Sequence, residues 1–482
     1  MDHRLTSSSA IRLLGDFTHG LRLASVPDDV RHQGALSLLD TIGCMVAGSA
    51  ASDAAAVLAA EGADAAGQCT IVGSRRRVGA RAAARCNGYL GDIFELNDLT
   101  GGHASIATVA AALAAAEVAR ASGRALLEAV VAGIEATTRI YNAVYPTFKG
   151  YDQCGMAPLG LPNAVGAAAA AARLRPLDAG RHAEALAIAA SLAGWCPAET
   201  TAGPASTVKP FLFGGWPASV GLLAAQYAAA GLTGPPFVLE SPVGWLGTVA
   251  RDPDVGAITD PTWALARPRR KLHACCGYTH AAIDSVLSLR GSQPGLLEQA
   301  RSIRVSLPPY TMHTVVKPGP PAAPNQARFD VRYCVAVAAA CGVPIVPAHS
   351  EEHARYLAQP PVADAYRKIS VVADDALTHY HQTRVRVELA DGRAVEEATS
   401  APRGTPDNPL SDEDVRAKFT RLAAPVLGAA AAERLRLTVE GIADAPGLEP
   451  LFALLRPDGS TSPEGLPRLV EDSNIIGLLF LL

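Results

Sequence analysis

Residues 108–119 of this 482-residue chain read TVAAALAAAEVA, and residues 166–173 read GAAAAAAR. Alanine is the strongest helix former, and its small side chain allows helices to pack closely. Apolar residues make up 49% of the chain and aromatic residues only 5%, which is typical of a well-buried protein with a core of small side chains. These runs predict a mainly α-helical fold.

Other helices are expected on both sides of these runs, because apolar residues recur there at helical spacing. Proline and two acids at residues 27–29 are typical of a first helical turn, and the helix that they open is expected to end near Gly48. The further expected helices are residues 103–121, 126–144, 161–174, 183–192 and 218–230.

The pattern changes after Pro268, where apolar and polar residues alternate in short stretches typical of half-buried strands. The expected strands are residues 302–307, 368–372, 383–389 and 393–398, with a hairpin turn at Asp391–Gly392 between the last two. Ser411 is then expected to cap a new helix.

The length of the chain exceeds what one core usually sustains, so two or more domains are expected. We divide it into a first helical part (residues 1–267), a smaller α+β domain (268–403) and a second helical part (404–482). If the second helical part rejoins the first, the α+β domain is an insertion.

The overall charge argues against several classes of partner. A formal net charge of −4 and a pI near 6.3 provide no basic surface for nucleic acid or anionic lipid. No apolar run reaches the roughly 20 residues of a membrane helix, and the N-terminus lacks the apolar core of a secretory signal, so we expect a cytoplasmic protein. The apolar tail, residues 475–482, is expected to pack on the body or on a second subunit.

The nine cysteines contain no C-x-x-C pair. This spacing argues against a disulfide scaffold and against a zinc or iron–sulfur ligand set. Most of the cysteines are expected to be small buried hydrophobic residues.

Residues 87–105, NGYLGDIFELNDLTGGHAS, are the most promising place for a site because they precede an almost apolar helix. Glu95 and Asp98 would share one face if the segment is helical. The glycines at 101–102 permit a sharp change of direction, so His103 could turn back toward the acids. An imidazole oriented by carboxylates is a common general base. The alternative is an exposed acidic helix end with a histidine in a turn.

Three further polar clusters interrupt the apolar pattern. Lys209 precedes a proline and a glycine-containing turn, and Lys271 precedes His280 at a predicted helix N-terminus. Each ammonium can bind a carboxylate, and the helix N-terminus adds backbone donors for an anion. Tyr333 belongs to the last cluster. The alternatives are a solvent-facing loop lysine at 209, a packed histidine or tyrosine in the second of these clusters, and a core tyrosine at 333.

In this order, the four clusters resemble the MmgE/PrpD family, which includes 2-methylcitrate dehydratase, cis-aconitate decarboxylase and iminodisuccinate epimerase. The resemblance spans most of the chain and includes Asp40-Thr-Ile-Gly-Cys44 and Asn408-Pro-Leu-Ser411. It implies a large all-helical domain built from both chain ends, with a smaller inserted α+β lid domain. It also implies a homodimer and a pocket between the domains that uses no metal or other cofactor.

The resemblance also implies roles for individual residues around a di- or tricarboxylic substrate. The catalytic positions fall on Glu95, Asp98, His103, His280 and Tyr333, and the substrate-binding positions on Lys209, Lys271, Cys276 and Asp152. We predict that His103 is the general base and that His280 or Tyr333 is the acid. An exposed loop acid is the alternative for Asp152.

We therefore predict a cofactor-independent lyase that most simply removes water from a small polycarboxylate. Epimerisation and decarboxylation of a related acid are alternatives that use the same proton-handling pocket, and a non-catalytic ligand-binding paralogue is another. Asn97 replaces an acid of the family pattern, and Leu99 stands where a polar residue is frequent. Cys276 occupies a position where cis-aconitate decarboxylase is expected to have a catalytic histidine, which favours dehydration.

Overall fold

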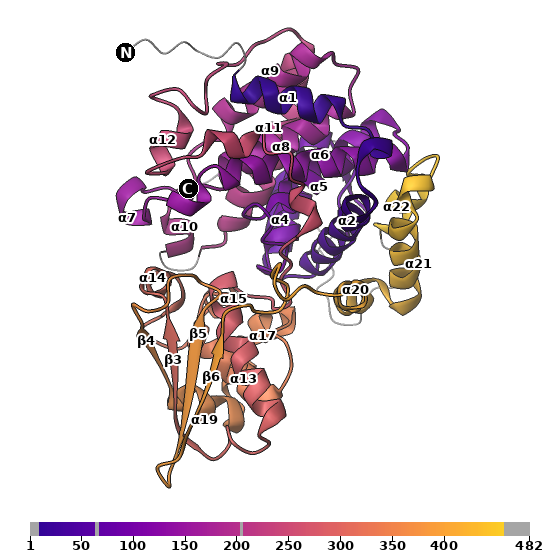
Figure 1. Cartoon of the computed structure of the whole chain (residues 1–482). Helices are drawn as coiled ribbons and strands as arrows, with labels where there is room; N and C mark the ends of the chain where they lie inside the picture. Colours follow the sequence, from indigo (N-terminus) through magenta and orange to yellow (C-terminus); the bar gives the residue numbers. More distant parts are fainter. Residues whose placement is uncertain (1–8, 63–66, 203–205, 457–482) are drawn as a thin grey trace, which may run out of the picture.

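The computed structural model describes residues 9–62, 67–202 and 206–456. A body of helices lies above a smaller part that contains a β-sheet (Figure 1). The mainly helical fold with a smaller α+β part is therefore confirmed. The predicted apolar tail, residues 475–482, lies outside the described residues.

The alanine-rich segments form the centre of the helical body. They correspond to α5 (Ala104–Ala119) and α8 (Gly160–Arg173), which pack against α6 (Gly123–Asn142) and α11 (Trp216–Ala229). The small residues allow close approach, since a Cβ atom at Gly133 would lie 2.6 Å from the Gly166 carbonyl oxygen. The predicted helices in this region are confirmed.

The remaining helices surround this centre. They are α1 (Ala10–Gly20), α2 (Asp28–Gly48), α3 (Ala54–Gly62), α4 (Ala80–Asp92), α7 (Tyr151–Cys154), α9 (Ala179–Leu192), α10 (Glu199–Ala202) and α12 (Trp245–Val249), with the short strands β1 (Cys69–Thr70) and β2 (Arg77–Val78). The start of α2 after Pro27 and its end at Gly48 agree with the prediction.

The four-stranded sheet lies in the lower part of the molecule (Figure 1). Its strands are β3 (Ala300–Leu307), β4 (Ile369–Ala373), β5 (Thr383–Leu389) and β6 (Ala394–Thr399), in the order β4-β3-β5-β6, with β3 and β4 parallel and the other pairs antiparallel. Ile303, Val305, Val385 and Val387 are fully buried beneath the helices. The predicted strands and the hairpin at Asp391–Gly392 are confirmed.

Helices pack against this sheet and connect its strands. They are α13 (His280–Ser292), α14 (Met312–Val315), α15 (Pro324–Arg328), α16 (Val331–Cys341), α17 (Pro347–Glu351), α18 (His353–Leu357) and α19 (Pro360–Lys368). We call the part formed by residues 272–403 the lid.

The chain returns from the lid to the helical body. Ser411 caps α20 (Asp412–Leu427), as predicted, and α20 packs on α2 with α21 (Ala429–Glu440) and α22 (Glu449–Leu454) beside them (Figure 1). The buried Lys418 ammonium joins α20 to the body through Asp40 on α2, at 2.8 Å. The domain boundaries chosen from the sequence stay predictions.

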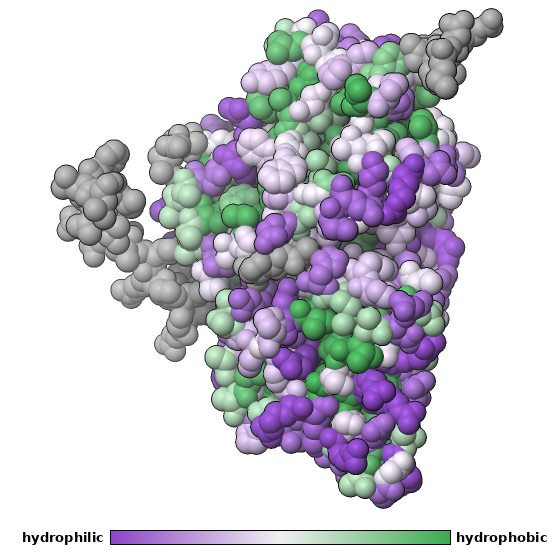
Figure 2. Space-filling model, turned by 90° about the vertical axis from the view of Figure 1, so that its left-hand side faces the viewer, coloured by the Kyte–Doolittle hydropathy of each residue, from purple (hydrophilic) through white to green (hydrophobic). Residues whose placement is uncertain are grey.

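Within the described ranges, no helix is both long enough and apolar enough to cross a lipid bilayer. Figure 2 shows one face of the molecule, on which apolar residues form separate groups among polar ones in both the upper and the lower part.

Candidate active site

The site is built on the connection between α4 and α5. Helix α4 ends at Asp92, and Glu95 has a backbone φ of +54°. Gly101, Gly102 and His103 then have φ values of +52°, +66° and +74° before α5 begins. Left-handed backbone at a residue with a side chain costs free energy and is found mostly where the surroundings enforce it. The predicted change of direction before His103 is confirmed.

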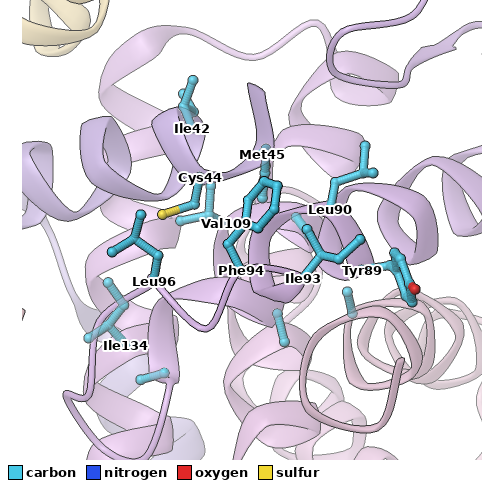
Figure 3. Packing of buried hydrophobic residues seen from close by; sticks show 14 of the residues in the cluster. Ile42, Cys44, Met45, Tyr89, Leu90, Ile93, Phe94, Leu96, Val109 and Ile134 are labelled. Atoms are coloured by element: carbon cyan, nitrogen blue, oxygen red, sulfur yellow. The ribbon is translucent and has the colours of Figure 1, made fainter. Parts of the chain in front are cut away.

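Apolar neighbours anchor this connection in the core. Phe94 and Leu96 are almost completely buried, and Figure 3 shows them beside Cys44 and Met45 of α2. Because these residues on either side of Glu95 are buried in the apolar core, the backbone that carries the carboxylate is firmly placed.

Close packing of two glycines brings Lys209 to the same place. A Cβ atom at Gly88 on α4 would lie 2.6 Å from the Gly214 carbonyl oxygen, so only glycine permits this approach. Gly214 belongs to a π-helical segment, Phe211–Gly215, where the sequence predicts a turn after Lys209. The Lys209 ammonium consequently lies 2.7 Å from the Asp92 carboxylate and also contacts Glu95.

Glu95 joins the two predicted lysines. The Lys271 ammonium lies 2.8 Å from the Glu95 carboxylate and donates a second hydrogen bond of 2.8 Å to the Glu95 carbonyl oxygen. Burial by itself would raise the pKa of Glu95, but the two ammonium groups hold it below its ordinary value. Burial raises the pKa of Asp92 to about 6, although Lys209 opposes this shift. The cluster is therefore a buried network of alternating charges.

His103 lies against this network as a neutral imidazole. Its Nδ1 atom is hydrogen-bonded to Asn97 Oδ1 and lies 3.9 Å from the Asp92 carboxylate. Burial lowers the pKa of His103 well below its ordinary value, and the Lys209 and Lys271 ammonium groups lower it further. A neutral imidazole at neutral pH is the form that a general base requires.

The lid side contributes the region around Lys271. His280 begins α13, and its Nε2 atom lies 3.3 Å from the Cys275 carbonyl oxygen. Burial lowers the pKa of His280 well below its ordinary value, with His273 and Lys271 adding to the effect. Burial also raises the pKa of Cys276 to about 12, so the thiol beside Glu95 and Lys271 stays protonated. Lys271 thus contacts the helical body through Glu95.

The structure separates Asp98 from Glu95. The expectation that the two acids share a helix face is wrong, because the helix has ended at Asp92 and the positive φ of Glu95 redirects the chain. Asp98 accepts a hydrogen bond from the Ser105 backbone N–H at the start of α5, at 3.4 Å. The charged groups that influence its carboxyl group include Asp40 and Arg270, whereas the ion pairs of Lys209 and Lys271 are with Asp92 and Glu95.

Tyr333 and Asp152 also lie apart from the charge network. Tyr333 is buried on α16 in the lid, where its hydroxyl donates a hydrogen bond to the His349 carbonyl oxygen. Asp152 is exposed on α7, near His313. The structure therefore brings together Glu95, His103, Lys209 and Lys271, with Cys276 and His280 next to Lys271, and the roles of all nine residues stay predictions.

Four residues of this region were not assigned a role from the sequence. Asp92 lies three positions before Glu95 in the same polar segment, so its place in that segment is a signal that the sequence offers. Asn97 stands in the sequence only as a departure from the family pattern. Tyr151 on α7 and Tyr278 in the lid lie close enough to influence each other electrostatically across the two parts. No local pattern relates two tyrosines 127 positions apart, so only the fold identifies this pair.

The chain is similar to known proteins over most of its length. The family model described as the MmgE/PrpD N-terminal domain matches residues 12–257, and the model described as the MmgE/PrpD C-terminal domain matches residues 273–444. The cis-aconitate decarboxylase-like protein oryM of Aspergillus oryzae is 28% identical over 469 residues, which cover 90% of this chain and 95% of that protein. A cis-aconitate decarboxylase of Aspergillus terreus is 26% identical over 462 residues, which cover 89% of this chain and 92% of that protein.

Proposed function

The chain belongs to the MmgE/PrpD family, and from this premise we propose that it is a lyase acting on a small di- or tricarboxylate. The observation that carries the proposal is the convergence of a buried, neutral His103 with two lysines that meet on Glu95. In this proposal His103 removes a proton from the carbon α to a carboxylate.

The lysines provide the anchors for the substrate. An ammonium has three donors, and each of Lys209 and Lys271 directs two hydrogen-bond or ion-pair contacts to Asp92 or Glu95 within the described residues. The third N–H of each lysine can donate to a substrate carboxylate. Charge-assisted hydrogen bonds of this kind are among the stronger ones in proteins.

In this proposal the arrangement supports dehydration, in which one proton is removed from carbon and one proton is given to the leaving hydroxyl. His103 takes the α proton, and the electron pair of the broken C–H bond delocalises into the adjacent carboxylate as an aci-carboxylate. Lys209 or Lys271 stabilises the added negative charge. The electron pair then forms the carbon–carbon double bond as the β-hydroxyl leaves, and that hydroxyl takes a proton from the acid to become water.

His280 and Tyr333 are the two candidates for the acid in this proposal. His280 lies close enough to Lys271 for their charges to interact, whereas the Tyr333 hydroxyl donates to the His349 carbonyl oxygen in the lid. The His280 Nε2 atom lies 3.3 Å from the Cys275 carbonyl oxygen, and burial lowers the pKa of His280, which disfavours its protonated form. In this proposal a substrate carboxylate beside His280 raises its pKa, because a nearby negative charge favours the imidazolium that can act as the acid.

Decarboxylation is the second candidate, because the two relatives named above are a cis-aconitate decarboxylase and a protein described as like one. In that reaction the carbon–carbon bond to a carboxylate breaks, carbon dioxide leaves, and a proton is delivered to carbon. The thiol of Cys276 has its pKa raised to about 12 and is a poor proton donor at neutral pH, which favours dehydration. The homodimer expected from the resemblance stays a prediction.

Proton NMR in deuterium oxide tests the proposal with a panel of hydroxy-, amino- and unsaturated di- and tricarboxylates. New vinyl signals from a hydroxy acid would support dehydration, and release of carbon dioxide from an unsaturated acid would support decarboxylation. Deuterium exchange at the α carbon without net conversion would indicate an epimerase. Folded protein that binds members of the panel without any exchange or conversion would contradict the enzyme and support the ligand-binding paralogue.

A further inference from the structure

Asn97 makes an unusual set of contacts for a residue that replaces a family acid. Its side chain is fully buried. The Nδ2 atom donates to Asp92 Oδ1 at 2.6 Å and lies 3.4 Å from the Gly91 carbonyl oxygen, and the Oδ1 atom is hydrogen-bonded to His103 Nδ1. Both ends of the amide are therefore engaged.

The chemistry of these partners determines which way the amide points. Asp92 and the Gly91 carbonyl supply only acceptors when the carboxylate is ionised, so the NH₂ group must face them. If the amide were reversed, its oxygen would face the Asp92 carboxylate and the Gly91 carbonyl oxygen. These oxygens all carry negative charge and would repel one another. The Asn97 oxygen therefore faces His103, and because a carbonyl oxygen only accepts, His103 Nδ1 must carry the hydrogen.

We propose that Asn97 is a positioning residue that holds neutral His103 in its Nδ1–H tautomer, so that Nε2 carries the lone pair that accepts the proton. No described residue forms a hydrogen bond with Nε2, which leaves that atom for a substrate. The use of Nε2 in catalysis rests on the proposed function, whereas the tautomer itself does not.

The same contacts connect the base to a substrate anchor. Asp92 Oδ1 accepts from Asn97, and Asp92 Oδ2 accepts from Lys209 at 2.7 Å. Lys209, Asp92, Asn97 and His103 thus form one hydrogen-bonded series in the helical body. A single carboxylate therefore sets the positions of both the anchoring ammonium and the imidazole.

An asparagine orients the imidazole without adding charge. The charged groups that face His103 are Asp92, Glu95, Lys209 and Lys271. An aspartate at position 97 would still accept from Nδ1–H, but its negative charge would favour the imidazolium and raise the pKa of His103. With asparagine at position 97, His103 therefore stays neutral down to a lower pH than it would with aspartate at that position.

The test is nitrogen NMR of protein labelled with ¹⁵N-histidine, since the two ring nitrogens have different shifts according to which one is protonated. The His103 signals are assigned by their loss in His103→Gln. We expect the wild-type protein to show the Nδ1–H tautomer. Asn97→Ala should introduce the Nε2–H tautomer and lower kcat by about 10- to 100-fold, as is typical when an orienting partner is removed, with little change in KM.

Two variants complete the design. Asn97→Asp keeps an acceptor at Nδ1, so it should retain the tautomer, restore part of kcat and move the acid limb of the kcat profile to higher pH. Asn87→Ala is the matched control, because Asn87 is equally buried and is bonded to the Val72 N–H and the Thr70 carbonyl, away from His103. It should leave the His103 signals unchanged.

An Nε2–H tautomer in the wild-type protein would overturn the inference, and this measurement needs no variant to fold. An unchanged tautomer in folded Asn97→Ala would overturn it as well. If the Nδ1–H tautomer is found but no polycarboxylate reacts, the inference stands and the proposed function fails.

Discussion

Asp98→Asn is expected to stabilise the protein above pH 7 and to remove a dependence of stability on pH. The Asp98 side chain is buried, and its Oδ2 atom has no hydrogen-bond partner among the described residues. Burial raises the pKa of this carboxyl group from 3.8 to about 7, and Asp40 adds to the shift while Ser105 and Arg270 oppose it. The folded protein therefore holds a proton that the unfolded chain releases.

The size of the effect follows from the two pKa values. Between pH 3.8 and about 7 the folded state binds more protons than the unfolded state at this position, so stability falls as the pH rises through that window. One pKa unit corresponds to about 1.4 kcal/mol, so the ionised carboxyl group costs about 4 kcal/mol above pH 7. Asparagine carries no charge and avoids this cost.

Urea unfolding of the wild-type protein and Asp98→Asn from pH 5 to 8.5 measures the difference. The gain in the free energy of unfolding should grow as the pH rises and level off above pH 7. Asp407→Asn is the matched control, because Asp407 is an exposed partner of Arg267. A constant difference between the wild-type protein and Asp98→Asn across the whole pH range would refute the reasoning.

The remaining predictions concern the charge network and the base. Lys209→Ala should raise KM and also destabilise the fold by about 3–5 kcal/mol, because it leaves Asp92 and Glu95 buried without one of their cations; an unchanged melting temperature would show that the network adds little to stability. His103→Gln should lower kcat by about 10²- to 10⁴-fold, the usual contribution of a general base, with the melting temperature as the control; full activity would mean that another residue is the base. The acid limb of kcat/KM should lie below pH 6.5, because burial and the two lysines lower the pKa of His103; a limb above pH 6.5 would contradict a neutral His103 in the free enzyme.

The helices and strands could be predicted because their patterns are local. The alternation in residues 383–389, for example, gives the bounds of β5 directly. The grouping of Lys209 and Lys271 with the 92–103 segment was expected only from the resemblance, since contacts between residues so far apart depend on the fold.

Two parts of the site depended on features that periodicity does not encode. Helical spacing predicts that Asp98 lies beside Glu95, but the left-handed backbone of Glu95 directs the two side chains apart. The resemblance predicts Tyr333 near the base, but its hydroxyl donates a hydrogen bond to the His349 carbonyl oxygen. The pattern of side chains in the sequence does not indicate where a backbone carbonyl lies. Asn97 was noted as a substitution, and its contacts with Asp92 and His103 give that substitution a function that we propose.

Two chain segments connect the helical body to the lid. They are hydrogen-bonded to each other and to the body. The Arg270 N–H donates to the Gly404 carbonyl oxygen at 2.8 Å, and the Leu99 N–H donates to the Arg269 carbonyl oxygen at 2.8 Å. Lys271 is held immediately beyond by Glu95. A rigid rotation of the lid that pivots beyond Lys271 would leave both lysines and His103 in place on the body. It would move Cys276 and His280 away from them together with the rest of the lid.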